Sequence, residues 1–414
     1  MPSKRRKLLD TATADVANIL VELSQNPTEN STPACSASID PAPTPCTVKL
    51  PSPATLGHQH TQTTKGHDSD IVAVKIKNVI LNHEIAKLRQ QLAECQETNE
   101  GVPGGHFGIH DVKDNDAKCK FYTGLTWDQF MCVWNYLGSA KDKVCYWNQQ
   151  LKTGEKSPSK RPGVRRKLSP LNEFFLMMVR LRVGLLNTDL AYRFGISPSS
   201  VSKIVTSWIQ FLYLQFGRMR NKMFASRQLL KHNMPPCFAK FKGIRVIIDC
   251  CEFFVEQSTH FRRQGNLYSS YKNHSTFKCL IGISPNGGVM FVSDAFEGSM
   301  SDNDIVKKSG FLDKLDAGDL ILADRGFTIR DMLYAKQVDL NIPPFLQGRN
   351  RLTVGEEITT KQIARVHIYV ERAIERIKKF RLLKRVIPLS LQPVFSQMVF
   401  VAGCLVNFQD PLVK

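Results

Sequence analysis

The stretch VIIDCCEFFVEQ, residues 246–257, begins with three β-branched residues and then runs into Asp249, with Glu252 and Glu256 close behind. β-Branched residues favour strands, so IRVIID (244–249) is predicted to be a strand that ends in an acid. A carboxylate at a strand end is costly to desolvate unless a cation, a proton or a hydrogen-bond donor compensates its charge. The question for the rest of the sequence is which group compensates the charge of Asp249.

The segments that follow alternate between strand and helix patterns. FKCLIGISPNGGVMFVSDAF (277–296) predicts two strands around a PNGG turn, and GDLILADRGF (318–327) predicts a strand that ends in Asp324. TTKQIARVHIYVERAIERIKKF (359–380) predicts a long basic helix with Glu371 and Glu375 on one face. The C-terminal part is therefore expected to be an α/β domain.

Carboxylates that converge from distant segments repel one another unless divalent cations lie between them. Mg²⁺ suits such a cluster, because it takes one or two carboxylates together with water and substrate phosphates. With two ions, one activates the attacking oxygen and the other stabilises the leaving oxygen of a phosphodiester. Each acid also has a structural alternative: Asp324 pairing with Arg325 or capping the next helix, and Glu371 pairing with Arg365 or Arg372.

Composition indicates the kind of partner. The 414 residues carry a net charge of +19, which favours a polyanion, either nucleic acid or an anionic membrane surface. No apolar run is expected to approach the length of a membrane span; the longest, MVFVAGCLV (398–406), predicts a buried helix, and no membrane partner is expected. The N-terminus lacks the apolar region of a secretory signal, and its basic cluster Lys4 to Lys7 is of nuclear-import type. The 11 cysteines, without a CxxC pair, indicate reduced thiols.

The N-terminal region divides into two segments. Residues 1–69 are basic and then rich in Ser, Thr and Pro, which predicts a disordered tail. Residues 70–98 carry an a/d heptad pattern with a single Asn78 at an a position, which favours a parallel homodimeric coiled coil. An amphipathic helix packed on the chain's own globular part is the alternative.

A helical region precedes the α/β domain. TGLTWDQFMCVWNYLGSA (123–140) predicts a helix capped by Thr126 and Gln129, and residues 141–167 form a basic segment that is either a linker or a phosphate-contacting loop. After the apolar helix 168–186, residues 187–213 predict two helices around a turn at Gly195. The second helix, capped by Ser197, would face DNA with Ser199, Ser200, Ser202 and Lys203. An ordinary helical hairpin is the alternative.

Several motifs together resemble the PIF/Harbinger-like branch of the DDE superfamily of transposases, in the group associated with a THAP-type zinc finger. The matching runs span about residues 120–410: FYTGLTWDQF, LAYRFGISPSSVSKI, IIDCCEFFVEQS, LYSSYKNHSTFKCLIGISPNGGVMFVS, FEGSMSDNDI, LILADRGF, NIPPFL and VERAIERIKKFRLL. The resemblance implies an RNase H-like catalytic domain, a mixed sheet flanked by helices, over 241–410. An all-α helix-turn-helix DNA-binding domain would occupy 111–240.

The resemblance also implies an Asp, Asp, Glu metal triad at Asp249, Asp324 and Glu371, with Glu375 as the weaker alternative for the third acid. It implies two Mg²⁺ or Mn²⁺ ions and a supporting role for Asp302. Further expected DNA contacts, besides those of the helix-turn-helix, are Lys272, His274, Lys378, Lys379 and Arg381.

The sequence departs from its relatives at three places. The zinc finger is missing, and Glu-Gln-Ser-Thr (256–259) replaces Glu-Arg-Pro-Ser. His367-Ile368-Tyr369 stands where relatives read Arg-Ile-His. Two functions remain open: a nuclear, metal-dependent endonuclease that hydrolyses DNA and transfers strands, and a domesticated DNA-binding protein that does not cut. A partner protein that supplies DNA binding is compatible with either.

Overall fold

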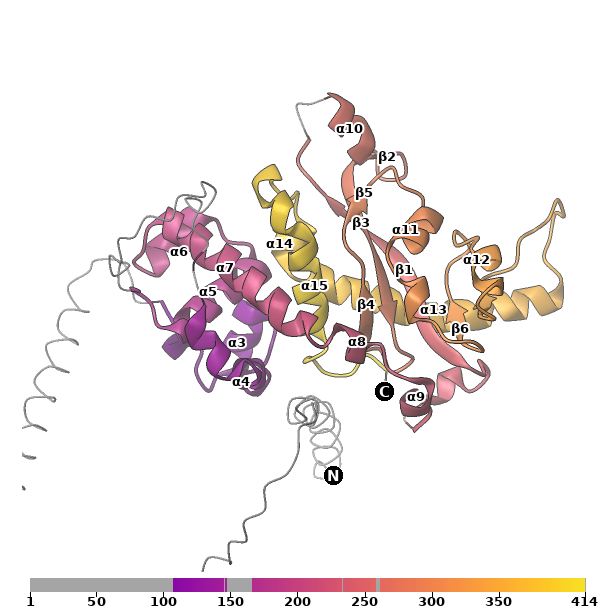
Figure 1. The fold of residues 1–414 in the computed structure, drawn as a ribbon, viewed down its shortest axis with the longest axis horizontal. Helices are drawn as coiled ribbons and strands as arrows, with labels where there is room; N and C mark the ends of the chain where they lie inside the picture. The colour runs from indigo at the N-terminus through magenta and orange to yellow at the C-terminus, as the bar shows by residue number, and fades with distance from the viewer. Residues whose placement is uncertain (1–106, 145, 147–165, 233, 258–260, 414) are drawn as a thin grey trace, which may run out of the picture. The chain divides into compact units, whose positions relative to one another are not determined.

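The computed structural model describes residues 107–144, 146, 166–232, 234–257 and 261–413. The predicted tail, the predicted coiled coil and most of the basic segment 141–167 lie outside the described residues. The described chain begins with a helical part and continues into a sheet covered by helices on both faces (Figure 1). An α/β domain preceded by an all-α part is thus confirmed.

The helical part consists of short helices around two longer ones. In chain order its elements are η1 (Ile109–Asp111), α3 (Asp116–Thr123), α4 (Trp127–Tyr136), η2 (Gly138–Lys143), α5 (Pro170–Val183), α6 (Asn187–Arg193), α7 (Pro198–Gly217), α8 (Arg220–Met223), α9 (Arg227–His232) and η4 (Pro236–Phe238).

Three helices begin at caps that their sequences favour. The Ser169 side chain accepts a hydrogen bond from the Asn172 backbone at the start of α5, and Ser197 does the same for Ser200 in α7. Thr126 and Gln129 form the predicted capping box of α4. These bonds satisfy backbone N–H groups that the first turn of a helix leaves without partners, so the local sequence sets where each helix begins.

The turn between α6 and α7 is the predicted one. Gly195 has a φ of 62°, a left-handed conformation that glycine adopts without steric cost. The short helix before it was predicted to begin at Leu190 and begins at Asn187. On α7 the residues that repeat at helical spacing form one buried face: Val201, Ile204, Val205 and Trp208.

A buried acid joins α5 to α7, and the hydrophobic pattern did not predict it. Glu173 is fully buried and accepts a hydrogen bond from Trp208 Nε1 at 3.0 Å. Its carboxylate also accepts a hydrogen bond from the Tyr146 hydroxyl and lies 3.7 Å from Arg166 Nη1. A buried carboxylate is tolerated when its oxygens are bonded and its charge is paired, so this network anchors both edges of the basic segment to the helical core.

The sheet combines antiparallel and parallel strands. Its strands are β1 (Ile244–Phe254), β2 (Tyr268–Ser269), β3 (His274–Ile283), β4 (Val289–Val292), β5 (Phe296–Glu297), β6 (Leu320–Leu322) and β7 (Asp339–Asn341). The order is β2-β3-β1-β6-β7, with β4 and β5 also paired to β3. β1 is antiparallel to β3 and parallel to β6, and β6 is parallel to β7.

Side chains of β1 alternate between two cores. Ile247, Cys251 and Phe253 belong to the core beneath α13 and α15, whereas Val246 and Ile248 belong to a second core on the opposite face. The helices of this part are α10 (Phe261–Leu267), α11 (Asp302–Lys308), η5 (Leu312–Lys314), α12 (Arg330–Tyr334), α13 (Val354–Lys378), α14 (Arg381–Lys384), η6 (Leu389–Val394) and α15 (Phe395–Val406).

Some predicted boundaries were wrong. The first strand runs to Phe254, so Asp249 lies in its middle, opposite Ile281 of β3, instead of at its end. Asp302 is the first residue of α11. The helix α13 begins at Val354, five residues before the predicted 359, because Thr353 and Glu356 form an additional capping box. The hairpin around PNGG is confirmed as β3 and β4.

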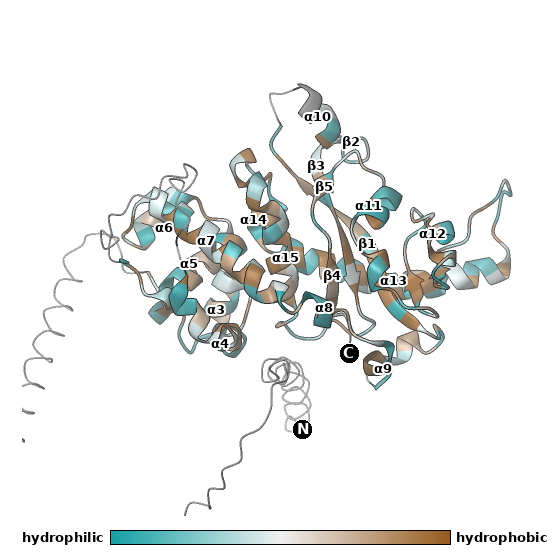
Figure 2. Ribbon diagram, viewed as in Figure 1, coloured by the Kyte–Doolittle hydropathy of each residue, from teal (hydrophilic) through white to brown (hydrophobic). Residues whose placement is uncertain are grey.

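The apolar segment near the C-terminal end is longer than predicted. Leu389–Val406 is long and apolar enough to cross a membrane by length and composition alone, contrary to the expectation that no run approaches that length. The segment consists of η6 and α15, and all residues of α15 from Met398 to Val406 are buried, as predicted for a buried helix. Figure 2 shows its hydrophobic colouring beside the sheet. The cysteines in the described part are free, in keeping with the predicted thiols.

Candidate active site

Asp249 points from β1 toward the face of the sheet that α13 covers. It shares this face with Cys251 and Phe253, since alternate residues of a strand face the same side. Its carboxylate is half-buried and accepts a hydrogen bond from the Cys250 backbone N–H at 2.8 Å. This local bond compensates only part of the charge.

Asp324 follows the strand that lies parallel to β1. Ile247 pairs with Leu322, so continuing the parallel register by two residues places Asp324 beside Asp249. Neighbouring strands are about 4.8 Å apart, which brings Asp324, just past the end of β6, next to Asp249 in the middle of β1. Asp324 is exposed, and within the described residues it makes neither the Arg325 pair nor the helix cap that a structural role would require.

Glu371 comes from the helix that packs on β1. α13 crosses β1 and β3, and Glu371 lies on it with its side chain 62% exposed. Its Oε1 is 3.5 Å from Nδ1 of His367, one helical turn earlier. Among the described residues, Glu371 therefore contacts His367 and forms neither of the ion pairs, with Arg365 or Arg372, that a purely structural role predicted. Glu375 is also exposed, but it lies 3.8 Å from Lys384 Nζ and is thus engaged with α14.

His367 contacts Glu371, influences the charge of Asp249, and was not predicted as a site residue. Its side chain is buried, and its Nε2 has no hydrogen-bond partner within the described residues. It lies near enough to Asp249 for its charge to lower the pKa of that carboxyl. The available signal was its four-residue spacing from Glu371, which puts both side chains on one face of the predicted helix.

The electrostatics of Asp249 reflect crowding by other acids. Burial raises the pKa of Asp249 to about 6, opposed by His367 and the Cys250 N–H, and increased further by Asp324 and Asp302. Negative charges are therefore gathered here without full compensation. Even so, among residues 107–413 as described, no three His, Cys, Asp or Glu side chains are close enough to form a ready metal site.

Asp302 belongs to a second ion network on the opposite face of β1. Lys278 Nζ lies 3.4 Å from Asp302 Oδ1 and 3.8 Å from Glu252 Oε1, and it donates to the Met300 carbonyl at 3.1 Å. Thr276 donates to Glu252 at 2.9 Å. Asp302 is thus held by an ammonium group. Sequence patterns did not single out Lys278, because its partners come from β1 and from α11.

The predicted DNA-facing residues of α7 are accessible. Ser199, Ser202 and Lys203 are exposed and Ser200 is half-buried. Ser199 and Ser200 contact the Ser197 hydroxyl at 3.0 Å and 2.9 Å. The first turns of α7 therefore present small serine side chains and one lysine, which allow the helix to approach a groove of DNA closely.

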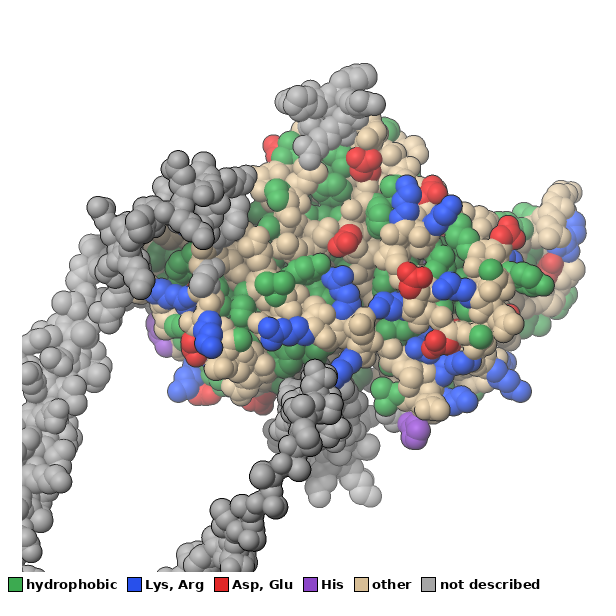
Figure 3. All heavy atoms as spheres, viewed as in Figure 1, with side chains coloured by type: hydrophobic (Ala, Val, Ile, Leu, Met, Phe, Trp, Pro, Cys, Tyr) green, Lys and Arg blue, Asp and Glu red, His purple; other side chains and the backbone are tan. Residues whose placement is uncertain are grey.

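The other predicted DNA contacts fall into two groups. Lys272 is exposed with Nζ 4.4 Å from the centre of the Tyr271 ring, which is itself 79% exposed and so does not pack the sheet. His274 is half-buried, with Nδ1 2.9 Å from the Ser275 carbonyl. In the second group, Lys379 and Arg381 are exposed, whereas Lys378 is half-buried against Phe253. Figure 3 shows Lys and Arg interspersed with acids on the face in view.

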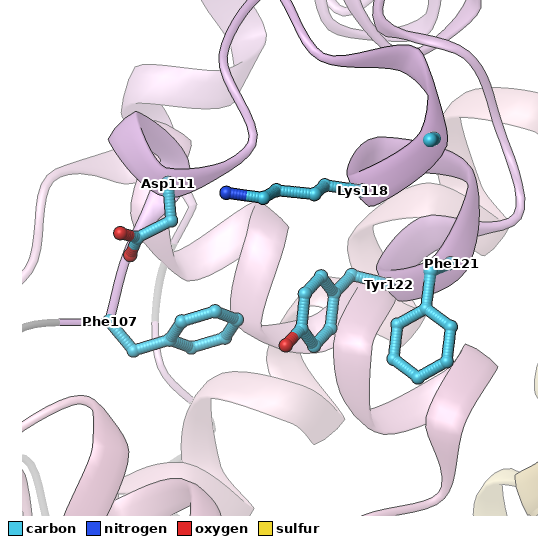
Figure 4. A pocket seen from close by; sticks show the side chains of 6 residues that line it. Phe107, Asp111, Lys118, Phe121 and Tyr122 are labelled. Carbon is cyan, nitrogen blue, oxygen red and sulfur yellow. The ribbon is translucent and has the colours of Figure 1, made fainter.

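A pocket of about 520 Å³ lies in the helical part, away from these acids in the fold. The rings of Phe107 and Tyr122 are 4.9 Å apart within it, with Lys118 and Asp111 at its edge (Figure 4). None of its lining residues belongs to the elements that carry Asp249, Asp324 or Glu371. It is a hollow at the surface of the helical part and is not part of the acidic site.

Comparison with protein families bears on both parts of the chain. Residues 248–407, which contain all three acids, match the family model of the DDE superfamily endonuclease. Residues 166–218, from the end of the basic segment through α7, match the helix-turn-helix of that same superfamily. Residues 248–407 are thus similar to a DDE superfamily endonuclease domain. Comparison with curated proteins gave no significant match, and neither did comparison with solved structures.

The helix-turn-helix match, followed along the chain by the endonuclease match, supports a transposase-derived nuclease with DNA as its partner. DDE endonucleases generally use divalent metals, and the donor set here is compatible with such ions. Asp249, Asp324 and Glu371 offer oxygen ligands of the kind that Mg²⁺ and Mn²⁺ take. The raised pKa of Asp249 beside other acids is also what a cation would relieve.

Proposed function

We propose that this protein is a metal-dependent DNA endonuclease of transposase type, with an RNase H-like fold and a kinship to the PIF/Harbinger group associated with THAP-type proteins. The observation that carries the proposal is the register of β1 and β6, which sets Asp324 beside Asp249 in a chain of net charge +19. A basic surface suits the DNA backbone, and a local acidic pair suits cations.

In this proposal Asp249, Asp324 and Glu371 hold two ions, Mg²⁺ or Mn²⁺. When bound, such ions activate the attacking water or 3′-hydroxyl and stabilise the leaving oxygen. Asp249 is fixed by its strand and by the Cys250 N–H, whereas Glu371 has to turn from His367 toward the two aspartates. Lys278 holds Asp302 at the opposite face and so fixes the position of that carboxylate beside β1.

Metal binding tests this assignment without relying on activity. Wild-type protein is expected to bind Mn²⁺ in calorimetric titrations, and Asp324→Asn is expected to weaken that binding at least about tenfold, since one of few charged ligands is removed. On supercoiled plasmid DNA, Mg²⁺ or Mn²⁺ should support nicking and EDTA should abolish it. Asp331→Asn, an exposed acid on α12, is the matched control. Equal Mn²⁺ binding by wild type and Asp324→Asn would contradict a metal site that includes Asp324.

A domesticated protein that binds DNA without cutting is the second candidate. It is favoured by the spacing of the acids, which form no ready ion site within the described part of the chain, and by His367 where relatives carry Arg. DNA binding without nicking under any divalent ion would support this candidate and contradict the first.

We further propose that residues 70–98 join two copies of the chain in the nucleus, with or without a partner protein that adds DNA specificity. The heptad pattern with Asn78 at an a position supports a parallel dimer. Deletion of residues 70–98 is expected to convert a dimer to a monomer in analytical sedimentation at micromolar concentration. An unchanged mass would exclude this role for the segment.

A further inference from the structure

Four arginines meet where α5 approaches α14, and we call them the junction arginines: Arg180, Arg182, Arg381 and Arg385. α5 lies within the helix-turn-helix match and α14 within the endonuclease match. The two helices pack closely at Gly184, where an added Cβ would lie 3.4 Å from the Arg381 backbone. Each domain therefore contributes two cations to one location.

Three of these arginines donate hydrogen bonds to backbone carbonyls where the two helices meet. Arg180 donates to the Leu185 carbonyl, and Arg385 Nη1 donates to the adjacent Gly184 carbonyl at 3.3 Å. Arg182 Nη1 donates to the Lys379 carbonyl at 2.9 Å, two residues before Arg381. Arg182 and Arg385 thus each donate a hydrogen bond to the backbone at the end of the opposite element.

The positive charge at this location is not neutralised by the protein. In the part of the chain that the structure describes, none of the four forms an ion pair with a carboxylate. The pKa of Arg180 is lowered by burial and then by Arg385, and the pKa of Arg182 by burial and then by Arg381. Like charges at short range destabilise the free protein, and a bound anion would reverse that effect.

We propose that the junction arginines form a phosphate-binding site for the DNA backbone, shared by the helix-turn-helix and the endonuclease domain. The proposal deepens the proposed function, since it rests on DNA being the ligand. A guanidinium has five N–H donors, and the carbonyl bonds use only some of them. Arg381 and Arg385 are exposed, so donors remain accessible to phosphate oxygens, which arginine binds in a bidentate geometry.

A site of this kind would couple the two domains through the DNA. A phosphate held from both sides fixes the orientation of the duplex relative to α7 and to the acidic site, without reading base sequence. Removing the site should therefore weaken binding similarly on all DNA sequences.

The test compares the full-length protein with the double variant Arg381→Gln/Arg385→Gln. The dependence of DNA affinity on salt concentration should fall by a slope of about 0.9 for each phosphate that the variant no longer neutralises, and affinity at low salt should fall on the order of tenfold. Arg381→Lys/Arg385→Lys retains the charge and should keep most of the slope. Arg330→Gln, an exposed arginine on α12, is the single-charge control and should keep the wild-type affinity.

Thermal melting of the free protein distinguishes a binding site from a structural link. If the arginines mainly repel one another, Arg381→Gln/Arg385→Gln keeps or raises the melting temperature. A fall of several degrees, together with an unchanged dependence of DNA affinity on salt concentration, would overturn the proposal. Stabilisation of wild type by inorganic phosphate alone, with no effect of the variant on DNA affinity, would identify a free-anion site and also overturn it. Wild type that binds no DNA would instead contradict the proposed function.

Discussion

Replacing Asp249 with Asn is expected to reduce DNA nicking by at least about 1,000-fold while leaving the affinity for DNA unchanged or slightly higher. The substitution keeps the size of the side chain and its bond to the Cys250 N–H, but it removes the charge that would hold a cation. Because the change also removes a negative charge from a DNA-facing site, it does not weaken attraction to phosphate.

The measurement is the initial rate of conversion of supercoiled to nicked plasmid, with affinity followed separately by fluorescence anisotropy. Asp324→Asn should have a similarly large effect, because the strand register places it beside Asp249. Asp331→Asn should cleave at the wild-type rate. Wild-type cleavage by Asp249→Asn would show that the nicking activity comes from another site or a contaminant.

Glu371 is the most informative of the three acids, since its side chain contacts His367 in the free protein. If Glu371→Gln cleaves normally and Glu375→Gln does not, the third acid has been assigned one helical turn too early.

Replacing Lys278 with Met is expected to lower the free energy of unfolding by about 3 kcal/mol. Lys278 lies between Glu252 and Asp302, whose side chains are 8% and 33% exposed, so its removal leaves two carboxylates without their cation. The loss of stability should be at the lower end of the range for buried pairs, because Asp302 is partly screened by water.

Urea unfolding at neutral pH measures this effect, and the double variant Lys278→Met/Glu252→Gln gives the coupling. The double variant should recover part of the stability, because Gln removes the unpaired charge while retaining an acceptor for Thr276. Lys336→Met, in an exposed pair with Asp313, should change stability by less than about 0.5 kcal/mol. Equal small effects at Lys278 and Lys336 would show that the network contributes nothing to stability.

Local features were predictable from sequence because they depend on neighbours in the chain. Ser169, Thr126 and Ser197 cap helices whose first-turn N–H groups lie two or three residues away, and Gly195 provides a left-handed turn. The apolar strands and the buried face of α7 follow from periodicity. Asp249 and Asp324 were found because each follows such a strand-like run.

Errors arose where partners at long range decide the outcome. The first strand continues to Phe254 because β3 pairs with it through Thr276, and strand propensity along the chain does not reveal that partner. The buried carboxylate Glu173 looked like one polar residue in an apolar helix, since Trp208, Tyr146 and Arg166 come from elsewhere in the chain.

The sequence by itself determined that this is a basic chain with a helix-turn-helix, an α/β domain and acids at the positions a cation site would use. Only the tertiary structure decided that Asp324 lies beside Asp249 and that the buried His367 contacts Glu371 and lowers the pKa of Asp249. It also decided that Lys278 pairs with Asp302 and that four arginines come together where α5 approaches α14. The physical reason is that charge–charge interactions depend on distance in space, whereas a sequence specifies only distance along the chain.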